Sequence, residues 1–277
     1  MTIWQTTRFD IDLSRPKIMG IVNVTPDSFS DGGQHLDALA AARQCERLVE
    51  EGADILDIGG ESSRPGAASL SVDEEWARIV DVLKAAVTLG VPVSVDTCKT
   101  EVMQRALGAG ADIVNDIKAL EAPGALDLVA AHGRCGVCLM HMKGEPGTMQ
   151  HRPSYPDVLA EVKAYLEGRL SALTTAGVRA ERITLDPGVG FGKTPEHNIE
   201  LLRRQADLLV LGRPLLLGWS RKSTLGHITG RAVEDRLAAS VAAALACVSK
   251  GARIIRVHDV AATSDALRVW QAAHLAA

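Results

Sequence analysis

The chain has 277 residues, of which 47% are hydrophobic, and its formal net charge is −4. This composition supplies a sizeable core and gives no general attraction for nucleic acid. The first residues contain no basic segment followed by an apolar one, and no later apolar run approaches about 18 residues, so neither export nor membrane insertion is indicated. We therefore expect a cytoplasmic enzyme that forms one domain over residues 1–277 and has neither a nucleic-acid nor a membrane partner.

The stretch from Met19 to Gly33, MGIVNVTPDSFSDGG, changes abruptly from an apolar run to a polar loop that ends in two glycines. The apolar and β-branched residues predict a strand, and the Pro, Asp, Ser and Gly residues predict a loop. Asn23 is thereby placed at the carboxyl end of the strand. Taken alone, the stretch is better explained as an ordinary strand-to-helix connection. Its repetition along the chain favours a functional interpretation.

Further segments follow the same plan, in which a glycine or a charged residue precedes β-branched and apolar residues and a polar side chain ends the run. The polar ends are, in chain order, Glu61 and Ser62, Asp96, Asn115 and Asp116, Met140 and His141, Asp186, Arg221 and Lys222, and finally Arg256, His258 and Asp259. With the opening stretch they make about eight strands, the number that closes a parallel α/β barrel.

Helical patterns lie between these strands, as parallel strands require for their crossovers. The clearest contains leucines and valine at intervals of three and four residues and ends before Gly177: Leu159, Val162, Leu166, Leu170 and Leu173. Similar stripes run from Ala41 to Val49 and from Leu237 to Val248. The predicted fold class is α/β, a single (β/α)8 TIM barrel with its active site at the carboxyl ends of the strands.

Several other residues are better explained by packing or solvation than by chemistry. Trp4 and Phe9 are expected to cover the lower end of the barrel. Cys135 and Cys138 have C-x-x-C spacing, but no second pair or His-x-His accompanies them, so two core thiols are favoured over metal or redox ligands. His151 lies in a Gly- and Pro-rich loop without an evident partner, and a solvated histidine is favoured over a catalytic one.

The ordered motifs resemble those of the dihydropteroate synthase family along essentially the whole chain. They are NVTPDSFSDGG (23–33), GGESSRPG (59–66), VDTCK (95–99), ND (115–116), LMHM (139–142), DPGVGFGK (186–193), SRKS (220–223) and RVHDV (256–260). Three positions depart from the commoner family pattern: Ser63 replaces a threonine, Cys98 a serine, and Val189 a larger apolar residue. These departures bear on affinity for aminobenzoate and for the sulfonamides that compete with it.

The resemblance implies an activity and its partners. Enzymes of this family join a dihydropterin, activated as its hydroxymethyl diphosphate, to p-aminobenzoate and release pyrophosphate in folate biosynthesis. It also implies a Mg²⁺ cofactor, a homodimer and a sulfonamide target. The Ala-rich stretch 238–246 is compatible with packing against either a neighbouring helix or a second subunit.

The chemistry of this reaction explains the residue types. No nucleophile set is needed if pyrophosphate leaves first, because the dihydropterin ring can spread the positive charge left on its exocyclic methylene. Arg256 and His258 alternate along one strand and can grip the diphosphate together with Asn23. A carboxylate such as Asp186 can accept the paired N–H donors of a pterin. Asp57 points into the barrel by alternation and has no assigned role.

Carried over residue by residue, the resemblance implies three groups of binding residues. Diphosphate is bound by Asn23, Ser63, Arg256 and His258, with Asn23 also the metal ligand. The pterin is bound by Asp96, Asn115, Met140, Asp186, Phe191 and Lys222. Aminobenzoate is bound by Ser28, Phe29, Ser63, Arg64, Pro65, Lys222 and Ser223, partly from two mobile loops. The catalytic set is Asn23, Asp96, Lys222, Arg256 and His258.

Two alternative functions remain open at this stage. One is a noncatalytic pterin-binding relative, and the other is a pterin-dependent methyltransferase domain that passes a methyl group to a corrinoid partner. Neither needs an aminobenzoate loop with Phe29 and Arg64 beside Lys222, Arg256 and His258, so the sequence favours the synthase.

Overall fold

The structure is a computed structural model that describes residues 3–25, 33–62 and 69–275. In these residues eight parallel strands close into a barrel in the order β10-β3-β4-β5-β6-β7-β8-β9. The strands are β3 (Lys17–Asn23), β4 (Ile55–Gly59), β5 (Val93–Asp96), β6 (Ile113–Asp116), β7 (Gly136–Met140), β8 (Ile183–Asp186), β9 (Leu215–Leu217) and β10 (Ala252–Val257). The predicted (β/α)8 barrel is thus confirmed.

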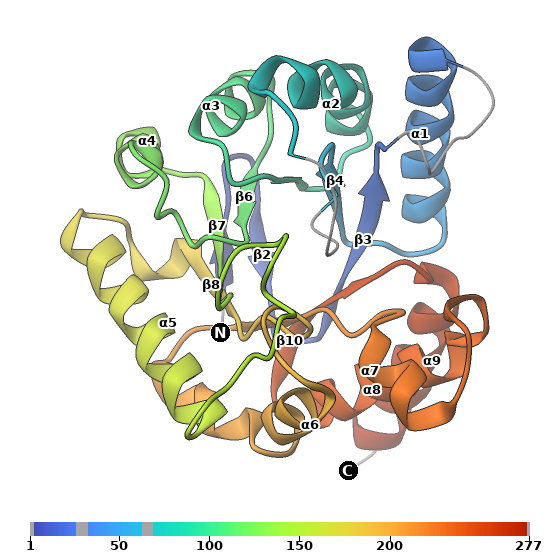
Figure 1. Cartoon of the computed structure of the whole chain (residues 1–277). Helices are drawn as coiled ribbons and strands as arrows, with labels where there is room; N and C mark the ends of the chain where they lie inside the picture. Colours follow the sequence, from blue (N-terminus) through green and yellow to red (C-terminus); the bar gives the residue numbers. More distant parts are fainter. Residues whose placement is uncertain (1–2, 26–32, 63–68, 276–277) are drawn as a thin grey trace.

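Helices form an outer ring around the strands (Figure 1). They are α1 (Gly33–Glu50), α2 (Val72–Val87), α3 (Thr100–Gly108), α4 (Ala125–His132), α5 (Val158–Thr175), α6 (Pro195–Arg203), α7 (Ser223–Thr229), α8 (Leu237–Ser249) and α9 (Val260–Leu275). Short 3₁₀ turns are η2 (Ala180–Arg182), η3 (Gln205–Leu211) and η4 (Val233–Asp235). Within the described ranges, none of these helices has the length and apolar character needed to cross a membrane.

Helix α5 shows why the predicted periodic stripes form helices. Asp157 caps its start, where the side chain accepts hydrogen bonds from the backbone N–H groups of Leu159 and Ala160, both at 3.0 Å. Most of the predicted stripe faces the barrel and is buried, and Gly177, with a φ of 87°, follows the helix end. The left-handed conformation favours glycine there and stops the helix.

The barrel interior has two layers of opposite character. The lower layer is apolar and buried, and consists of Met19, Ile55, Ile113, Cys138, Leu216 and Ile254. Because strand side chains alternate, the residue two positions later on each strand also points inward, one layer higher. These upper residues include Ile21, Asp57, Asn115, Met140 and Arg256. The lower layer is therefore apolar, whereas the upper layer carries the polar side chains of Asp57, Asn115 and Arg256.

The lower end of the barrel is closed by an antiparallel hairpin of β1 (Ile3–Gln5) and β2 (Asp10–Asp12). Trp4 is completely buried against the lower layer, its indole N–H donates to the carbonyl of Arg182 at 2.9 Å, and Phe9 packs beside it. The predicted covering role of Trp4 and Phe9 is confirmed. Cys135 and Cys138 are buried free thiols in the core, as expected.

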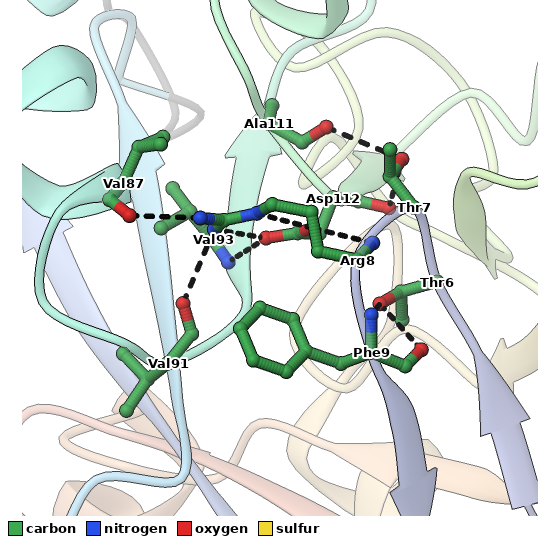
Figure 2. A network of polar contacts seen from close by, with 9 residues as sticks. All are labelled: Thr6, Thr7, Arg8, Phe9, Val87, Val91, Val93, Ala111 and Asp112. Carbon is green, nitrogen blue, oxygen red and sulfur yellow. Dashed lines mark hydrogen bonds and ion pairs between the residues drawn. The ribbon is translucent and has the colours of Figure 1, made fainter.

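A buried carboxylate fastens the hairpin turn to the barrel (Figure 2). Asp112, just before β6, accepts from the Arg8 guanidinium at 2.6 Å, from the Arg8 backbone N–H at 3.0 Å and from the Val93 backbone N–H at 2.9 Å. Arg8 also donates to the carbonyl of Val87 at 2.8 Å and lies over the Phe9 ring. Charge-assisted hydrogen bonds from Arg8 to Asp112 therefore tie the hairpin to the lower end of the barrel.

Candidate active site

Four polar side chains from four strands meet inside the upper layer. The Arg256 guanidinium donates from Nε to Asp57 Oδ2 at 2.5 Å and from Nη2 to Asp96 Oδ2 at 2.7 Å. The same oxygen of Asp57 accepts from Asn115 Nδ2 at 3.2 Å. Arg256, a predicted diphosphate residue, therefore contacts two predicted pterin residues, Asp96 directly and Asn115 through Asp57. Asp57, which sequence reasoning left without a role, is the residue that joins them.

The register of the strands explains how these groups come together. Asn23 pairs with Gly59, Gly59 with Asp96, and Asp96 with Asn115, so the four positions form one row across the mouth. Gly59 contributes no side chain, and a Cβ there would lie 3.4 Å from that of Asp96. The row therefore has side chains at Asn23, Asp96 and Asn115 and none at Gly59, which lies between Asn23 and Asp96.

The electrostatics of Asp96 differ from those of an ordinary surface carboxylate. Burial raises the pKa of Asp96 to about 7, and the positive Arg256 opposes that rise. The nearby carboxylates of Asp57, Glu75 and Asp116 add to it. A carboxyl group with a pKa near neutrality can change its charge when a ligand arrives, which is typical of functional sites.

The loop from Asp186 to Lys193 forms the opposite wall. Asp186 is buried at the end of β8, and its Oδ1 accepts from the backbone N–H of Gly188 at 2.7 Å. Burial raises the pKa of Asp186. Phe191 lies with its ring centroid 4.3 Å from Lys222 Nζ, a cation–π contact. Met140 lies opposite Asp186 in the strand register. These predicted pterin residues converge in the structure.

The third part of the site follows β9 and β10. His258 lies just after β10, and its Nδ1 is 3.0 Å from Ser220 Oγ, which also accepts from the His258 backbone N–H at 3.2 Å. Burial and the charge of Arg256 lower the pKa of His258 to about 3. The imidazole is thus neutral at neutral pH and acts as a hydrogen-bonding group. Ser223 begins helix α7 directly after Lys222.

A cavity of about 320 Å³ opens beside Asp96. Its lining comes from the loops after β4, β5, β6 and β7, and includes Glu61, Ser62, Thr97, Ile117, Lys118 and Pro146. Of the predicted pterin residues, Asp96 alone is among those that line this cavity. Glu61 and Glu75, which line the cavity, both bind Lys99 Nζ, the latter at 2.6 Å.

The predicted aminobenzoate residues Ser28, Phe29, Ser63, Arg64 and Pro65 lie outside the described residues, so their placement stays a prediction. Lys222 and Ser223 are described and stand at the mouth. His151 lies in the 141–156 loop and is exposed, in agreement with the solvated assignment.

Sequence reasoning missed two residues that hold the predicted ones. Asp57 could have been found because it is a carboxylate at an inward position of an otherwise apolar strand. Ser220, which binds His258, gave no distinctive signal beyond its motif. Asp116 is different, because its oxygens bind the backbone N–H groups of Lys118 and Leu120 and shape the turn after β6.

A magnesium ion is implied by the family resemblance, and the residues present fit a lightly held one. In the described ranges no group of three or more His, Cys, Asp or Glu side chains could hold a metal ion. Asn23 is half-buried at the end of β3 and offers an amide oxygen in the row described above. Mg²⁺ commonly takes few protein ligands when substrate phosphates supply the others, which agrees with one amide oxygen.

Comparisons with known proteins agree with this geometry. The model of the pterin binding enzyme family matches residues 19–258. The chain is 54% identical over 276 residues to the dihydropteroate synthase of Neisseria meningitidis serogroup B, covering 98% of this chain and 97% of that protein.

Solved structures with bound ligands are similarly close. The dihydropteroate synthase of Xanthomonas albilineans with 4-aminobenzoic acid has a TM-score of 0.91 at 51% identity, covering 97% of this chain and 96% of that one. The same protein in complex with 7,8-dihydropteroate has a TM-score of 0.89 at 48% identity, with 97% of each chain covered. The Yersinia pestis dihydropteroate synthase in a sulfonamide drug complex has a TM-score of 0.93 at 43% identity, covering 99% of this chain and 100% of that one.

Proposed function

The chain belongs to the pterin-binding enzyme family, and on that premise we propose that it is a dihydropteroate synthase that joins a dihydropterin diphosphate to p-aminobenzoate. The observation that carries the proposal is the mouth itself, where Arg256 bridges Asp57 and Asp96 while Asp186 and Phe191 form the facing wall. The site combines a cationic group for an anion with carboxylates and an aromatic ring for a flat, donor-rich heterocycle.

In this reaction the C–O bond to the diphosphate breaks, and its electron pair leaves with pyrophosphate. The exocyclic methylene keeps a positive charge that the dihydropterin ring spreads. The aminobenzoate nitrogen then bonds to that carbon and loses a proton. The protein does not form a bond to the substrate, so its contribution is orientation, charge stabilisation and exclusion of water.

Each part of the mouth has a role in that scheme. Asp96, Asn115 and Asp186 orient the pterin by hydrogen bonds, with Met140 and Phe191 packed against it. Arg256, neutral His258 and Asn23 bind the departing diphosphate. Ser63, which the family resemblance implies, joins them. Lys222 stands over Phe191, where the two substrates meet. Ser223 and the residues Ser28, Phe29, Ser63, Arg64 and Pro65 bind aminobenzoate.

Magnesium, when bound by Asn23 and the diphosphate, supplies positive charge to the leaving group. Sulfonamides, which resemble aminobenzoate, are proposed to compete at the same place, and the drug-bound relative described above supports this. Binding of a sulfonamide that aminobenzoate does not reverse would contradict that part of the proposal.

We further propose a homodimer in the cytoplasm. Helices α7 to α9 and η4 carry exposed apolar side chains, including Ile228, Val233, Leu237 and Val269, which a second subunit would cover. All five cysteines are free thiols, which agrees with a reducing compartment. Light scattering that gives only monomer at micromolar concentration would contradict the dimer.

The direct test of the activity is pyrophosphate release with both substrates present. We expect release to require the dihydropterin diphosphate and aminobenzoate together, with dihydropteroate formed in equal amount. A noncatalytic pterin-binding protein would bind the pterin without release. A methyltransferase domain would instead transfer a methyl group to a corrinoid partner and show no dependence on aminobenzoate.

A further inference from the structure

Lys193, the last residue of the loop after β8, is a buried lysine that no step of the reaction uses. Its side chain is 2% exposed. Its Nζ donates to the carbonyl of Gly188 at 2.9 Å and to that of Phe191 at 3.0 Å, and it lies 2.9 Å from His141 Nδ1. A fourth, longer contact joins Nζ to the carbonyl of His141 at 3.4 Å. The three shorter contacts match the three N–H donors of an ammonium.

The loop that ends at Lys193 has three glycines in a left-handed backbone conformation, which residues with a Cβ rarely adopt. Gly188, Gly190 and Gly192 all have positive φ, at 71°, 82° and 62°. A Cβ on Gly188 would lie 1.8 Å from the carbonyl oxygen of His141, and one on Gly192 would lie 2.2 Å from that of Lys143. The loop is therefore pressed directly against the chain that follows β7, and its own carbonyls need a donor.

The pressed loop carries two parts of the pterin wall. The Gly188 backbone N–H fixes one oxygen of Asp186 at 2.7 Å, and Phe191 presents its ring to Lys222. Lys193 binds the carbonyls of the same two residues, Gly188 and Phe191. One ammonium thus holds both the residue that fixes the Asp186 carboxylate and the residue that supplies the aromatic face.

The electrostatics show that this position is costly for a lysine. Burial lowers the pKa of Lys193 to about 7, and the negative Asp186 opposes that change. Burial and the charge of Lys193 lower the pKa of His141 to about 3, so that its ring is neutral and Nδ1 can accept. The His141 ring is held edge-on to Tyr165, with centroids 5.1 Å apart. An apolar residue would be easier to bury, which argues that the hydrogen bonds of Lys193 serve the site.

We propose that Lys193 is a positioning residue for pterin binding, whose ammonium locks the 187–192 loop against the end of β7 and so sets Asp186 and Phe191 for the ring. This inference rests on the proposed function. It predicts damage confined to the pterin half of the site, because Arg256, His258 and Asn23 come from other strands.

The test is Lys193→Met, which keeps the length and apolar stem of the side chain and removes its donors. Two dissociation constants are measured by calorimetry, one for 6-hydroxymethylpterin and one for pyrophosphate with Mg²⁺. We expect the dissociation constant of the pterin to rise about tenfold or more, and that of pyrophosphate to change by less than about twofold. Unchanged pterin binding, or equal weakening of both ligands, would overturn the proposal, because a general loss of stability does not choose between them.

Two further variants complete the design. Lys143→Met removes a half-exposed lysine of the adjacent segment, which pairs with Glu161 at 3.0 Å, and is expected to leave both constants unchanged. If Lys193→Met does not fold, His141→Phe removes one acceptor of Lys193 while keeping a ring beside Tyr165. This variant should weaken pterin binding without weakening pyrophosphate binding, and unaltered pterin affinity would count against the proposal. Wild-type pyrophosphate release, measured alongside, tests the proposed function separately.

Discussion

Asp57 and Arg256 form an ion pair inside the barrel mouth, with Arg256 Nε 2.5 Å from Asp57 Oδ2. The Asp57 side chain is completely buried, whereas that of Arg256 is 21% exposed. The carboxylate thus anchors the guanidinium from below while leaving part of it open to the mouth. Asn115 donates to the same oxygen, so Asp57 connects Arg256, proposed to bind the diphosphate, with Asn115, proposed to bind the pterin.

We expect Asp57→Asn to lower kcat/KM by about two orders of magnitude, or about 2.7 kcal/mol, because Arg256 loses the charge that fixes it. Steady-state kinetics with both substrates would measure the change. Asp54→Asn is the matched control, because Asp54 pairs with Lys17 at the opposite end of the barrel, at 3.1 Å. Equal losses in the two variants would show that the effect is not one of positioning.

Pterin affinity should depend on pH through Asp96. Its pKa is raised by burial to about 7, and the ionised carboxylate is the form that accepts hydrogen bonds. The ionised fraction rises with pH, so affinity should increase by up to about tenfold per pH unit below the pKa and level off above it. Calorimetric titrations of one pterin between about pH 5.5 and 8.5 would record this. Asp96→Asn should flatten the curve, and a profile that keeps its slope in this variant would assign the titration to another group.

Lys222→Ala should impair turnover while leaving the fold intact. Lys222 follows β9 at the mouth and stands over Phe191. Its loss removes a cation from the proposed meeting place of the two substrates. We expect kcat to fall at least about tenfold and the free energy of unfolding to change by less than about 1 kcal/mol. Lys17→Ala, at the other end of the barrel, is the control for kcat. Unfolding of Lys222→Ala in the same denaturant series would support a structural role instead.

Pyrophosphate should create affinity for aminobenzoate. The pterin wall is built on strand ends, whereas Phe29, Ser63 and Arg64 belong to two Gly- and Pro-rich loops of the sequence. If diphosphate held by Asn23, Arg256 and His258 orders those loops, aminobenzoate must in turn raise the affinity for pyrophosphate by the same factor, because linkage is reciprocal.

The measurement for this linkage is a titration of aminobenzoate with and without pyrophosphate and Mg²⁺. We expect binding only in their presence in the wild type, and loss of the enhancement in Arg256→Ala. Equal aminobenzoate affinity under both conditions would remove the proposed coupling.

The sequence by itself determined the barrel and most of the residues at its mouth. Apolar runs ending in polar residues, with helical stripes between them, require parallel strands joined by crossovers. Because all carboxyl ends of such strands lie on one side, Asp96, Asn115, Asp186 and Arg256 could be placed together without coordinates. The covering role expected of Trp4 and Phe9 at the lower end of the barrel is also confirmed.

Only the tertiary structure decided which partners these residues take. Arg256 binds Asp57, which is far away in the chain, because β10 and β4 both flank β3. Met19 of β3 pairs with Arg256 on one side and, on the other, with Ile55, two positions before Asp57. Lys193 enters the sequence analysis only as the last residue of the DPGVGFGK motif, and the close approach of the glycine loop to His141 is what buries it. Hydrogen bonds between segments depend on ångström-scale packing, which periodicity along the chain does not encode.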